Sequence, residues 1–190
     1  MRKIFALTGF ARSGKDTLYK GFERACESVG MNCVRVAFAD CLKEDIDPFL
    51  LSKLGISAWT EDNEEKFIIR PLLVEYGRAA RKLDPLVWAK QAEKKIDNDD
   101  NSIYIVTDTR YLNELQSMRN TYSTDQVVCV YVNNEDAPAA NEEERESIRV
   151  ILETKGTVNK VISWANMDEE ELKIQSIKLA TEILWENGEL

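Results

Sequence analysis

The sequence predicts an α/β protein with a parallel β-sheet, and three observations support this prediction. Five short apolar runs rich in β-branched residues recur along the 190 residues. The runs are unbroken rather than alternating with polar residues, as expected for strands that are covered on both faces. Segments with apolar residues at helical spacing lie between the runs. A chain that alternates strand and helix in this way is typical of one parallel sheet with helices on both faces.

The first strand and the first helix are predicted at residues 3–8 and 15–29. The strand is the first apolar run of the sequence. In the helical segment Leu18, Phe22 and Ala25 recur at helical spacing and therefore lie on one stripe. This stripe predicts the face of the helix that packs on the sheet.

The segment that follows the second predicted strand, at residues 33–38, breaks the alternation. Residues 40–96 are mainly helical in pattern, with candidate helices at 65–76 and 85–96. This connection is far longer than a simple crossover between parallel strands. We therefore expect a helical insertion at about residues 40–96 within one domain. The core of this domain would consist of residues 1–39 and 97–190.

The second half of the chain resumes the alternation. Apolar runs predict strands at 102–107, 127–132 and 158–164, and amphipathic patterns predict helices at 113–120 and 168–186. The last helix begins with an acidic turn, which is favourable at a helix N terminus.

Residues 133–146, between the fourth and fifth predicted strands, form a second irregular segment. They contain Pro138, two alanines and a run of acidic side chains. This composition is typical of a mobile lid or of a solvated loop. We expect a lid at about residues 133–149.

The composition excludes several classes of function. The net charge is −9, with 25 basic and 34 acidic residues, and this acidity argues against nucleic-acid binding. The absence of histidine excludes catalytic triads of serine or cysteine with histidine. No apolar run has the length of a membrane span, so we expect no membrane partner. The four cysteines show neither a CxxC pair nor zinc-ligand spacing, which favours free thiols and a cytoplasmic protein.

The strongest functional signal lies between the first strand and the first helix, where residues 9–17 read GFARSGKDT. This is the position that a P-loop requires. Glycines let backbone N–H groups curl around phosphates, the helix N terminus adds its positive end, and Lys15 reaches the β- and γ-phosphates. Asp16 stands where Ser or Thr is usual, and it could hold Mg²⁺ through a water molecule. The candidate nucleotide-binding residues are Gly9, Arg12, Ser13, Gly14, Lys15, Asp16 and Thr17; the alternative is a glycine-rich turn that binds no ligand.

A second candidate for the phosphate site ends the third predicted strand. Asp108 follows a run of apolar residues. A carboxylate at the C-terminal end of a parallel strand lies beside the phosphate loop, close to the metal. Asp108 is therefore a candidate Mg²⁺ residue. An Asp in this place is also typical of a turn or of a helix cap.

Arginines are the candidates for binding a phosphate acceptor. Transfer to a phosphate needs cations more than a base, because the acceptor is already ionised. Arg78 and Arg81 are three residues apart, so on a helix they share a face and could clamp one phosphate. The alternative for each is a surface arginine paired with an acid. Further arginine candidates are Arg70, Arg110, Arg145 and Arg149.

Three aromatic residues could stack on a nucleotide base, or they could belong to the core: Phe38, Tyr76 and Trp88.

Four segments spread over most of the chain match one known family. They are Gly14-Lys15-Asp16-Thr17, Phe38-Ala39-Asp40 with Leu42-Lys43, the block from Leu73 to Trp88, and Thr107-Asp108-Thr109-Arg110-Tyr111-Leu112-Asn113-Glu114. Together with a strand and turn at 162–166, they resemble the deoxynucleoside monophosphate kinases of tailed bacteriophages.

The resemblance implies a P-loop kinase fold with a five-stranded parallel sheet flanked by helices, a substrate-binding insertion and a lid. It implies that ATP and Mg²⁺ are used, and that a homodimer is possible. Lys15, Asp108 and Arg110 would be catalytic, and Asp16 and Asp108 would lie near the metal. The substrate-binding residues would be Asp40, Lys43, Arg70, Arg78, Arg81, Trp88, Glu114 and Arg145.

The predicted reaction is phosphoryl transfer from ATP to a deoxynucleoside monophosphate, giving ADP and the diphosphate, in the host cytoplasm if the protein is phage-encoded. One alternative is another small-molecule P-loop kinase, acting on a phosphorylated metabolite or on dephospho-coenzyme A. Another is a non-catalytic nucleotide-binding protein, for which Asp16 is the supporting feature. A guanine-nucleotide switch lacks its Asn-Lys-x-Asp motif, because Asn159-Lys160 is followed by Val161-Ile162.

Overall fold

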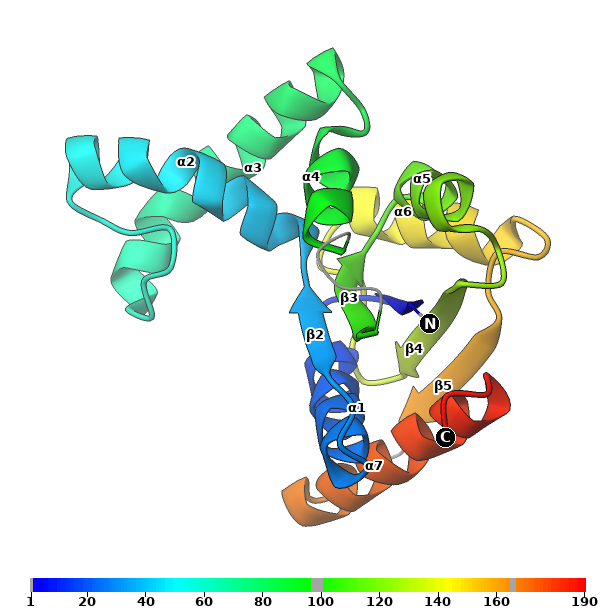
Figure 1. Cartoon of the computed structure of the whole chain (residues 1–190). Coiled ribbons are helices and arrows are strands. Elements are labelled where there is room, and N and C mark those ends of the chain that lie inside the picture. The colour runs from blue at the N-terminus through cyan, green and yellow to red at the C-terminus, as the bar shows by residue number, and fades with distance from the viewer. Residues whose placement is uncertain (1, 97–100, 165–166) are drawn as a thin grey trace.

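A five-stranded parallel sheet forms the centre of the molecule, with the strand order β2-β3-β1-β4-β5 (Figure 1). The structure is a computed structural model that describes residues 2–96, 101–164 and 167–190. It confirms the predicted α/β fold and parallel sheet. The strands are β1 (Lys3–Thr8), β2 (Cys33–Val36), β3 (Ile103–Thr109), β4 (Val127–Asn134) and β5 (Lys160–Trp164).

Helices lie on both faces of this sheet and also project from it. Figure 1 shows α1 and α7 together on one side, whereas α2 and α3 extend away from the sheet. The helices are α1 (Lys15–Ser28), α2 (Phe38–Leu54), α3 (Asn63–Leu83), α4 (Val87–Ile96), α5 (Leu112–Tyr122), α6 (Glu142–Glu153) and α7 (Glu169–Glu186). Among the described residues, no helix is both long and apolar enough to cross a membrane.

The hydrophobic core consists of one layer on each face of the sheet. All six residues of β1 are buried, and their side chains alternate between the faces because a strand is pleated. Ile4 and Ala6 pack in a cluster with residues of α4, α5 and α6, whereas Phe5 and Leu7 pack with residues of α1 and α7. Coverage on both faces is the property that the unbroken apolar runs predict.

The predicted helical insertion is present as α2, α3 and α4, which connect β2 to β3. Two of its boundaries differ from the prediction. The predicted strand at 33–38 ends at Val36, because the N–H groups of Phe38 and Ala39 already begin α2. The predicted helix at 65–76 is longer at both ends, and its N terminus is capped by the Asp62 side chain. The predicted boundary at residue 97 and residues 165–166 of the predicted turn lie outside the described residues.

The predicted lid segment is more regular than a loop. Strand β4 continues to Asn134, and α6 begins at Glu142. The side chain of Asn141 caps α6 by accepting a hydrogen bond from the N–H of Glu144 at 2.8 Å. The run of acids at 142–144 therefore forms the first turn of a helix, where negative charge is favourable. This corrects the interpretation of 133–146 as one continuous loop.

Candidate active site

The loop between β1 and α1 has the backbone of a phosphate-binding loop. Gly9 and Gly14 have φ values of 142° and 94°, and Arg12 has a φ of 64°. A Cβ atom on Gly9 would lie 2.3 Å from the carbonyl oxygen of Val132, so no side chain fits there. In the described structure no side chain caps the start of α1, so its first N–H groups face the loop. Such groups at a helix N terminus bind anions.

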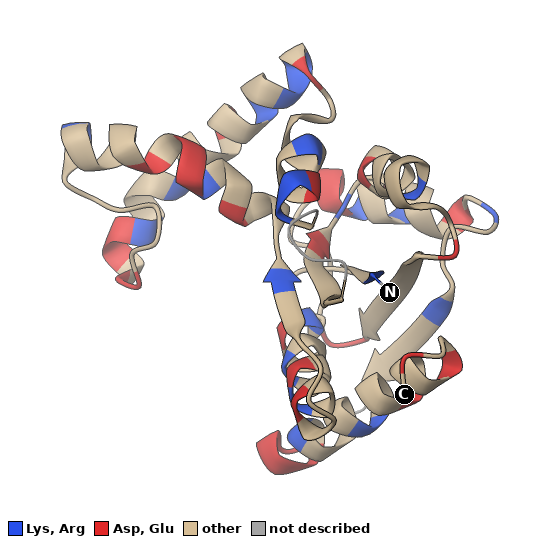
Figure 2. Cartoon of the chain, in the orientation of Figure 1, with Lys and Arg blue, Asp and Glu red and all other residues tan. Residues whose placement is uncertain are grey.

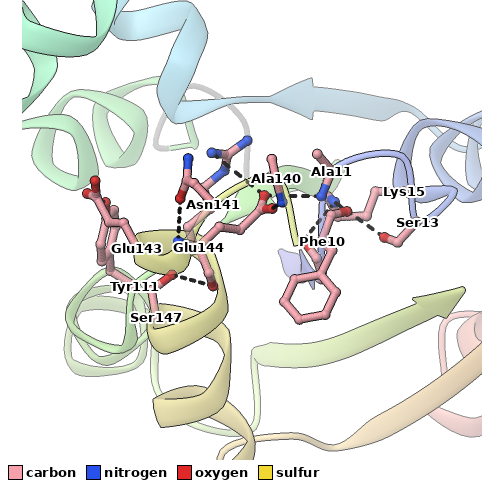
Figure 3. A network of polar contacts seen from close by, with 12 residues as sticks. Phe10, Ala11, Ser13, Lys15, Tyr111, Ala140, Asn141, Glu143, Glu144 and Ser147 are labelled. Carbon is pink, nitrogen blue, oxygen red and sulfur yellow. Dashed lines mark hydrogen bonds and ion pairs between the residues drawn. The ribbon is translucent and has the colours of Figure 1, made fainter. Parts of the chain in front are cut away.

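Lys15 begins α1 and points back into this loop. Its ammonium donates hydrogen bonds to the carbonyl oxygens of Gly9 at 2.9 Å and of Phe10 at 2.6 Å (Figure 3). Burial, together with the nearby positive charge of Arg110, lowers the pKa of Lys15 to about 8. Lys15 therefore remains mostly protonated at neutral pH, and an anion beside its ammonium favours this charged form.

Two cavities adjoin the loop. The larger has a volume of about 330 Å³ and is bounded by α2, α3 and α6 and by the segment after β3; Ala11 of the loop forms part of its wall. The smaller, of about 190 Å³, is lined by Arg12, Gly14 and Thr17 of the predicted nucleotide-binding segment and by Asn134 and Trp164 at the ends of β4 and β5.

Cations gather around the larger cavity, although the chain as a whole is acidic. Basic and acidic residues are interspersed over most helices (Figure 2), and the net charge is −9. The lining also holds four acidic side chains, so cations slightly outnumber acids there, whereas acids outnumber cations in the chain as a whole; the acids are Asp108, Glu114, Glu143 and Glu144. The cations that line it are Lys43, Arg70, Arg78, Arg81 and Arg110.

Three of these arginines have defined contacts. Arg78 forms ion pairs with Glu75 and, at 3.0 Å, with Glu143 of α6. The guanidinium of Arg81 lies 4.9 Å from the centre of the Tyr111 ring, and its buried Nε has no hydrogen-bond partner among the described residues. Arg110 lies 3.9 Å from a carboxylate oxygen of Glu144.

Two carboxylates, the half-buried Asp108 and the buried Glu114, hold the backbone around the same cavity. Asp108 accepts hydrogen bonds from the N–H groups of Phe38 and Ala39, both at 2.8 Å, and so joins the end of β3 to the start of α2. Burial raises the pKa of Asp108. Glu114 accepts from the N–H groups of Arg110 and Tyr111, both at 3.0 Å, and burial raises the pKa of Glu114 to about 7.

The sequence of residues 7–124 matches the model of a family described as phosphomevalonate kinase. The chain belongs to the phosphomevalonate kinase family. The matched residues include the P-loop, the whole helical insertion and the segment after β3. The kinase prediction is therefore confirmed at the level of a family, although the matched family is not the phage one that the sequence resembles. No curated protein matches the chain.

Solved structures of other kinases resemble this phosphomevalonate kinase family member only distantly. A gluconokinase from Sinorhizobium meliloti 1021 is 11% identical, with 99% of each chain covered and a TM-score of 0.46. An APS kinase from Mycobacterium tuberculosis is also 11% identical, with 95% of this chain and 97% of that chain covered and a TM-score of 0.47.

The structure corrects the prediction for several substrate-binding residues of this family member. Trp88 is 2% exposed and packs in the core against Tyr76, so no ligand can stack on it. Asp40 is paired with Arg35 and lies outside the described lining of the cavity. Arg145 and Arg149 are exposed on α6 and are paired with acidic neighbours of the same helix. The solvated-arginine alternative holds for these two.

Three residues at the site were not predicted from the sequence: Tyr111, Glu143 and Glu144. The Tyr111 hydroxyl donates a hydrogen bond to Glu143 at 2.7 Å, and Glu143 in turn holds Arg78. The carboxylate of Glu144 reaches the P-loop itself. An Asn followed three residues later by a Glu is a recognisable helix start and could have placed α6. Nothing in the local pattern could have indicated which distant loop this helix start contacts.

Proposed function

We propose that the protein transfers the terminal phosphoryl group of ATP to the phosphate of a small phosphomonoester. One observation carries this proposal: a cavity lined by five cations opens directly onto the P-loop. A P-loop by itself would bind one anionic substrate, the nucleotide. A second cluster of cations beside it is the feature that a second anionic substrate requires, because two phosphates repel each other strongly at reacting distance.

The donor nucleotide would lie along the P-loop. The free N–H groups at the start of α1 and the ammonium of Lys15 would bind its phosphates, and Thr17 would contact the α-phosphate. Mg²⁺ would neutralise charge on the phosphates, with Asp16 holding it through water and Asp108 contributing negative charge from the end of β3. Each oxygen of Asp108 retains a second lone pair beyond its bond to α2. No group of three or more acidic or thiol side chains among the described residues forms a metal site, which suits an ion held mainly by substrate phosphates.

The acceptor phosphate would be bound by the arginines of α3 together with Arg110. Its oxygens are already ionised near neutral pH, so the transfer needs no general base, in agreement with a histidine-free chain. The helices α2 to α4 would then serve as the substrate-binding insertion, and α6 with the segment before it as the lid.

Two acceptors are candidates. A deoxynucleoside monophosphate is the first, because the motifs resemble its kinases and because an apolar wall faces the cavity beside the cations, formed by Phe38, Leu42, Leu73 and Val74. The second is phosphomevalonate, which the family match favours. Both carry a phosphate that accepts a phosphoryl group, so the two candidates share the chemistry of transfer.

The test is ADP production from ATP and Mg²⁺ with a panel of acceptors. The panel contains the common deoxynucleoside and ribonucleoside monophosphates, phosphomevalonate, and mevalonate and deoxynucleosides as acceptors without a phosphate. We expect ADP production that depends on a phosphomonoester and is lost in Lys15→Ala. ADP production with the phosphate-free acceptors alone would contradict the proposal.

A further inference from the structure

The carboxylate of Glu144 is buried against the P-loop. Its side chain is 3% exposed. One oxygen accepts a hydrogen bond from the N–H of Ala11 at 3.1 Å and lies 3.9 Å from the guanidinium of Arg110, and the other accepts from the N–H of Ala140 at 2.7 Å. Figure 3 shows Glu144 reaching from α6 to the loop beside Lys15. The negatively charged carboxylate of Glu144 therefore lies beside an N–H group and a guanidinium that are also suited to bind a phosphate.

The two cavities give the P-loop a direction. Thr17, Gly14 and Arg12 line the smaller cavity, whereas the next residue toward β1, Ala11, lines the larger cavity with the proposed acceptor arginines. A triphosphate that runs along the loop with its nucleoside at the smaller cavity therefore ends at Ala11. The terminal phosphoryl group must pass from this end of the triphosphate to the acceptor. The N–H of Ala11 and the side chain of Arg110 therefore lie next to the position that this group would occupy.

We infer that Glu144 occupies the position of the transferring phosphoryl group, and that it sets the relative affinity of the protein for ATP and ADP. This inference rests on the proposed function. The carboxylate and the terminal phosphate of ATP compete for the same donors, so ATP must displace Glu144. ADP ends one phosphate earlier and leaves Glu144 in place. Glu144 is thus a specificity-determining residue that weakens ATP binding selectively.

The contact also prepares the site for the phosphate. A carboxylate and a phosphate accept hydrogen bonds from the same kinds of donor. While Glu144 is bound, the N–H of Ala11 and the guanidinium of Arg110 are held near the positions that a phosphate would need. When Glu144 leaves, α6 keeps the cap that Asn141 provides through the N–H of residue 144. Release of the carboxylate therefore does not require the helix to unfold.

The test is the ratio of ATP to ADP affinity in Glu144→Gln. Titration calorimetry with a non-hydrolysable ATP analogue and with ADP gives both affinities without turnover. We expect the variant to bind the ATP analogue about tenfold more tightly relative to ADP, because a negative charge no longer opposes the terminal phosphate. Glu146→Gln is the matched control, since it removes the same charge from an exposed position of α6 that is paired only with Arg149 among the described residues. Its ratio should equal that of the wild type.

A measurement on the wild-type protein serves if the glutamine variant does not fold. Hydrogen exchange over residues 137–147 should be faster with the ATP analogue than with ADP, because the N–H of Ala140 loses its acceptor when Glu144 leaves. An unchanged affinity ratio in a folded variant, or equal exchange with the two nucleotides, would overturn this inference while leaving the proposed function intact. Failure of the wild type to bind either nucleotide would overturn the proposed function and this inference together.

Discussion

The ammonium of Lys15 donates hydrogen bonds to carbonyl oxygens of its own loop, and burial lowers the pKa of Lys15 to about 8. In the free protein this lysine loses its proton as the pH rises through 8, and the neutral amine attracts phosphate weakly. We therefore expect ATP affinity to fall between pH 7 and pH 9. Lys15→Arg should flatten this profile, because arginine stays charged throughout the range. Nucleotide titrations over pH test this prediction, and a flat wild-type profile would contradict it.

Removal of the side chain is the stronger test of the same residue. Lys15→Ala should reduce turnover by roughly 10³-fold or more, the scale expected for a central group that stabilises transferred charge. The fold should persist, because the side chain contributes charge rather than core packing. Circular dichroism and thermal unfolding provide the check on folding. Turnover close to that of the wild type in a folded variant would remove the P-loop from the reaction.

Arg81 is well placed to bind the proposed acceptor, with its guanidinium over Tyr111 and its Nε buried in the cavity wall. Arg81→Ala should lower kcat/KM for the acceptor by about 10- to 100-fold, since loss of a charge-assisted contact costs about 1.5–3 kcal/mol. The KM for ATP should change little. Arg149→Ala is the control, because Arg149 is exposed and outside the cavity. Equal losses for ATP and acceptor would place Arg81 on the donor side.

At the scale of elements, α1 and α7 approach each other through Gly21. A Cβ atom on Gly21 would lie 2.3 Å from the carbonyl oxygen of Ser176, which belongs to the backbone of α7 and cannot turn aside. Gly21→Ala should therefore destabilise the protein by about 1–3 kcal/mol. Gly77→Ala is a helical control in which the added atom meets the ends of two flexible side chains, those of Leu42 and Arg81, and no backbone atom of another element. Chemical denaturation of both variants compares the losses, and an equal loss would show that close helix approach is not the cause.

Glu114, in the first turn of α5, makes the stability of the folded protein depend on pH. Its pKa of about 7 in the folded protein exceeds the ordinary 4.5, so between these values the folded state holds a proton that the unfolded chain has released. Stability therefore falls as the pH rises from 4.5 to 7. Glu114→Gln keeps an oxygen for the two N–H groups and removes the buried charge. We expect it to be more stable than the wild type at pH 8 by about 3 kcal/mol, with no gain at pH 4.5. Thermal unfolding at both pH values tests this, and a loss of stability at pH 8 would contradict it.

The elements differ in how far their sequences determine them. The strand β1 and the loop after it could be predicted because their signals are local: an unbroken apolar run and glycines at P-loop spacing. The end of β2 could not be predicted from its own sequence. The N–H of Phe38, where α2 begins, donates a hydrogen bond to the carboxylate of Asp108, which is 70 residues away. The start of α6 was misread as a loop, because a run of acids is typical both of a solvated segment and of a first helical turn.

At the scale of the whole molecule, the site depends on contacts between segments that are distant in sequence. Ala11 and Glu144 are 133 residues apart, and only the folded chain brings them together. Charge and motif predicted that Arg70, Arg78 and Arg81 of the insertion bind an anion, and all three line the larger cavity, but the pairing of Arg78 with Glu143 of α6 could not be predicted. Trp88 illustrates the same limit: an aromatic residue near a predicted site can belong to the core, and only its 2% exposure decides.

The central claim is that the phosphoryl group of ATP is transferred to a phosphate, and ³¹P NMR of the complete reaction tests it most directly. The protein, ATP, Mg²⁺ and the acceptor identified from the panel are incubated, and the phosphorus signals are followed with time. The account predicts that the monoester signal of the acceptor is replaced by the two coupled signals of a diphosphate, in step with the formation of ADP, and that Lys15→Ala abolishes the change. Release of inorganic phosphate alone, or a new monoester formed on a hydroxyl group, would contradict it.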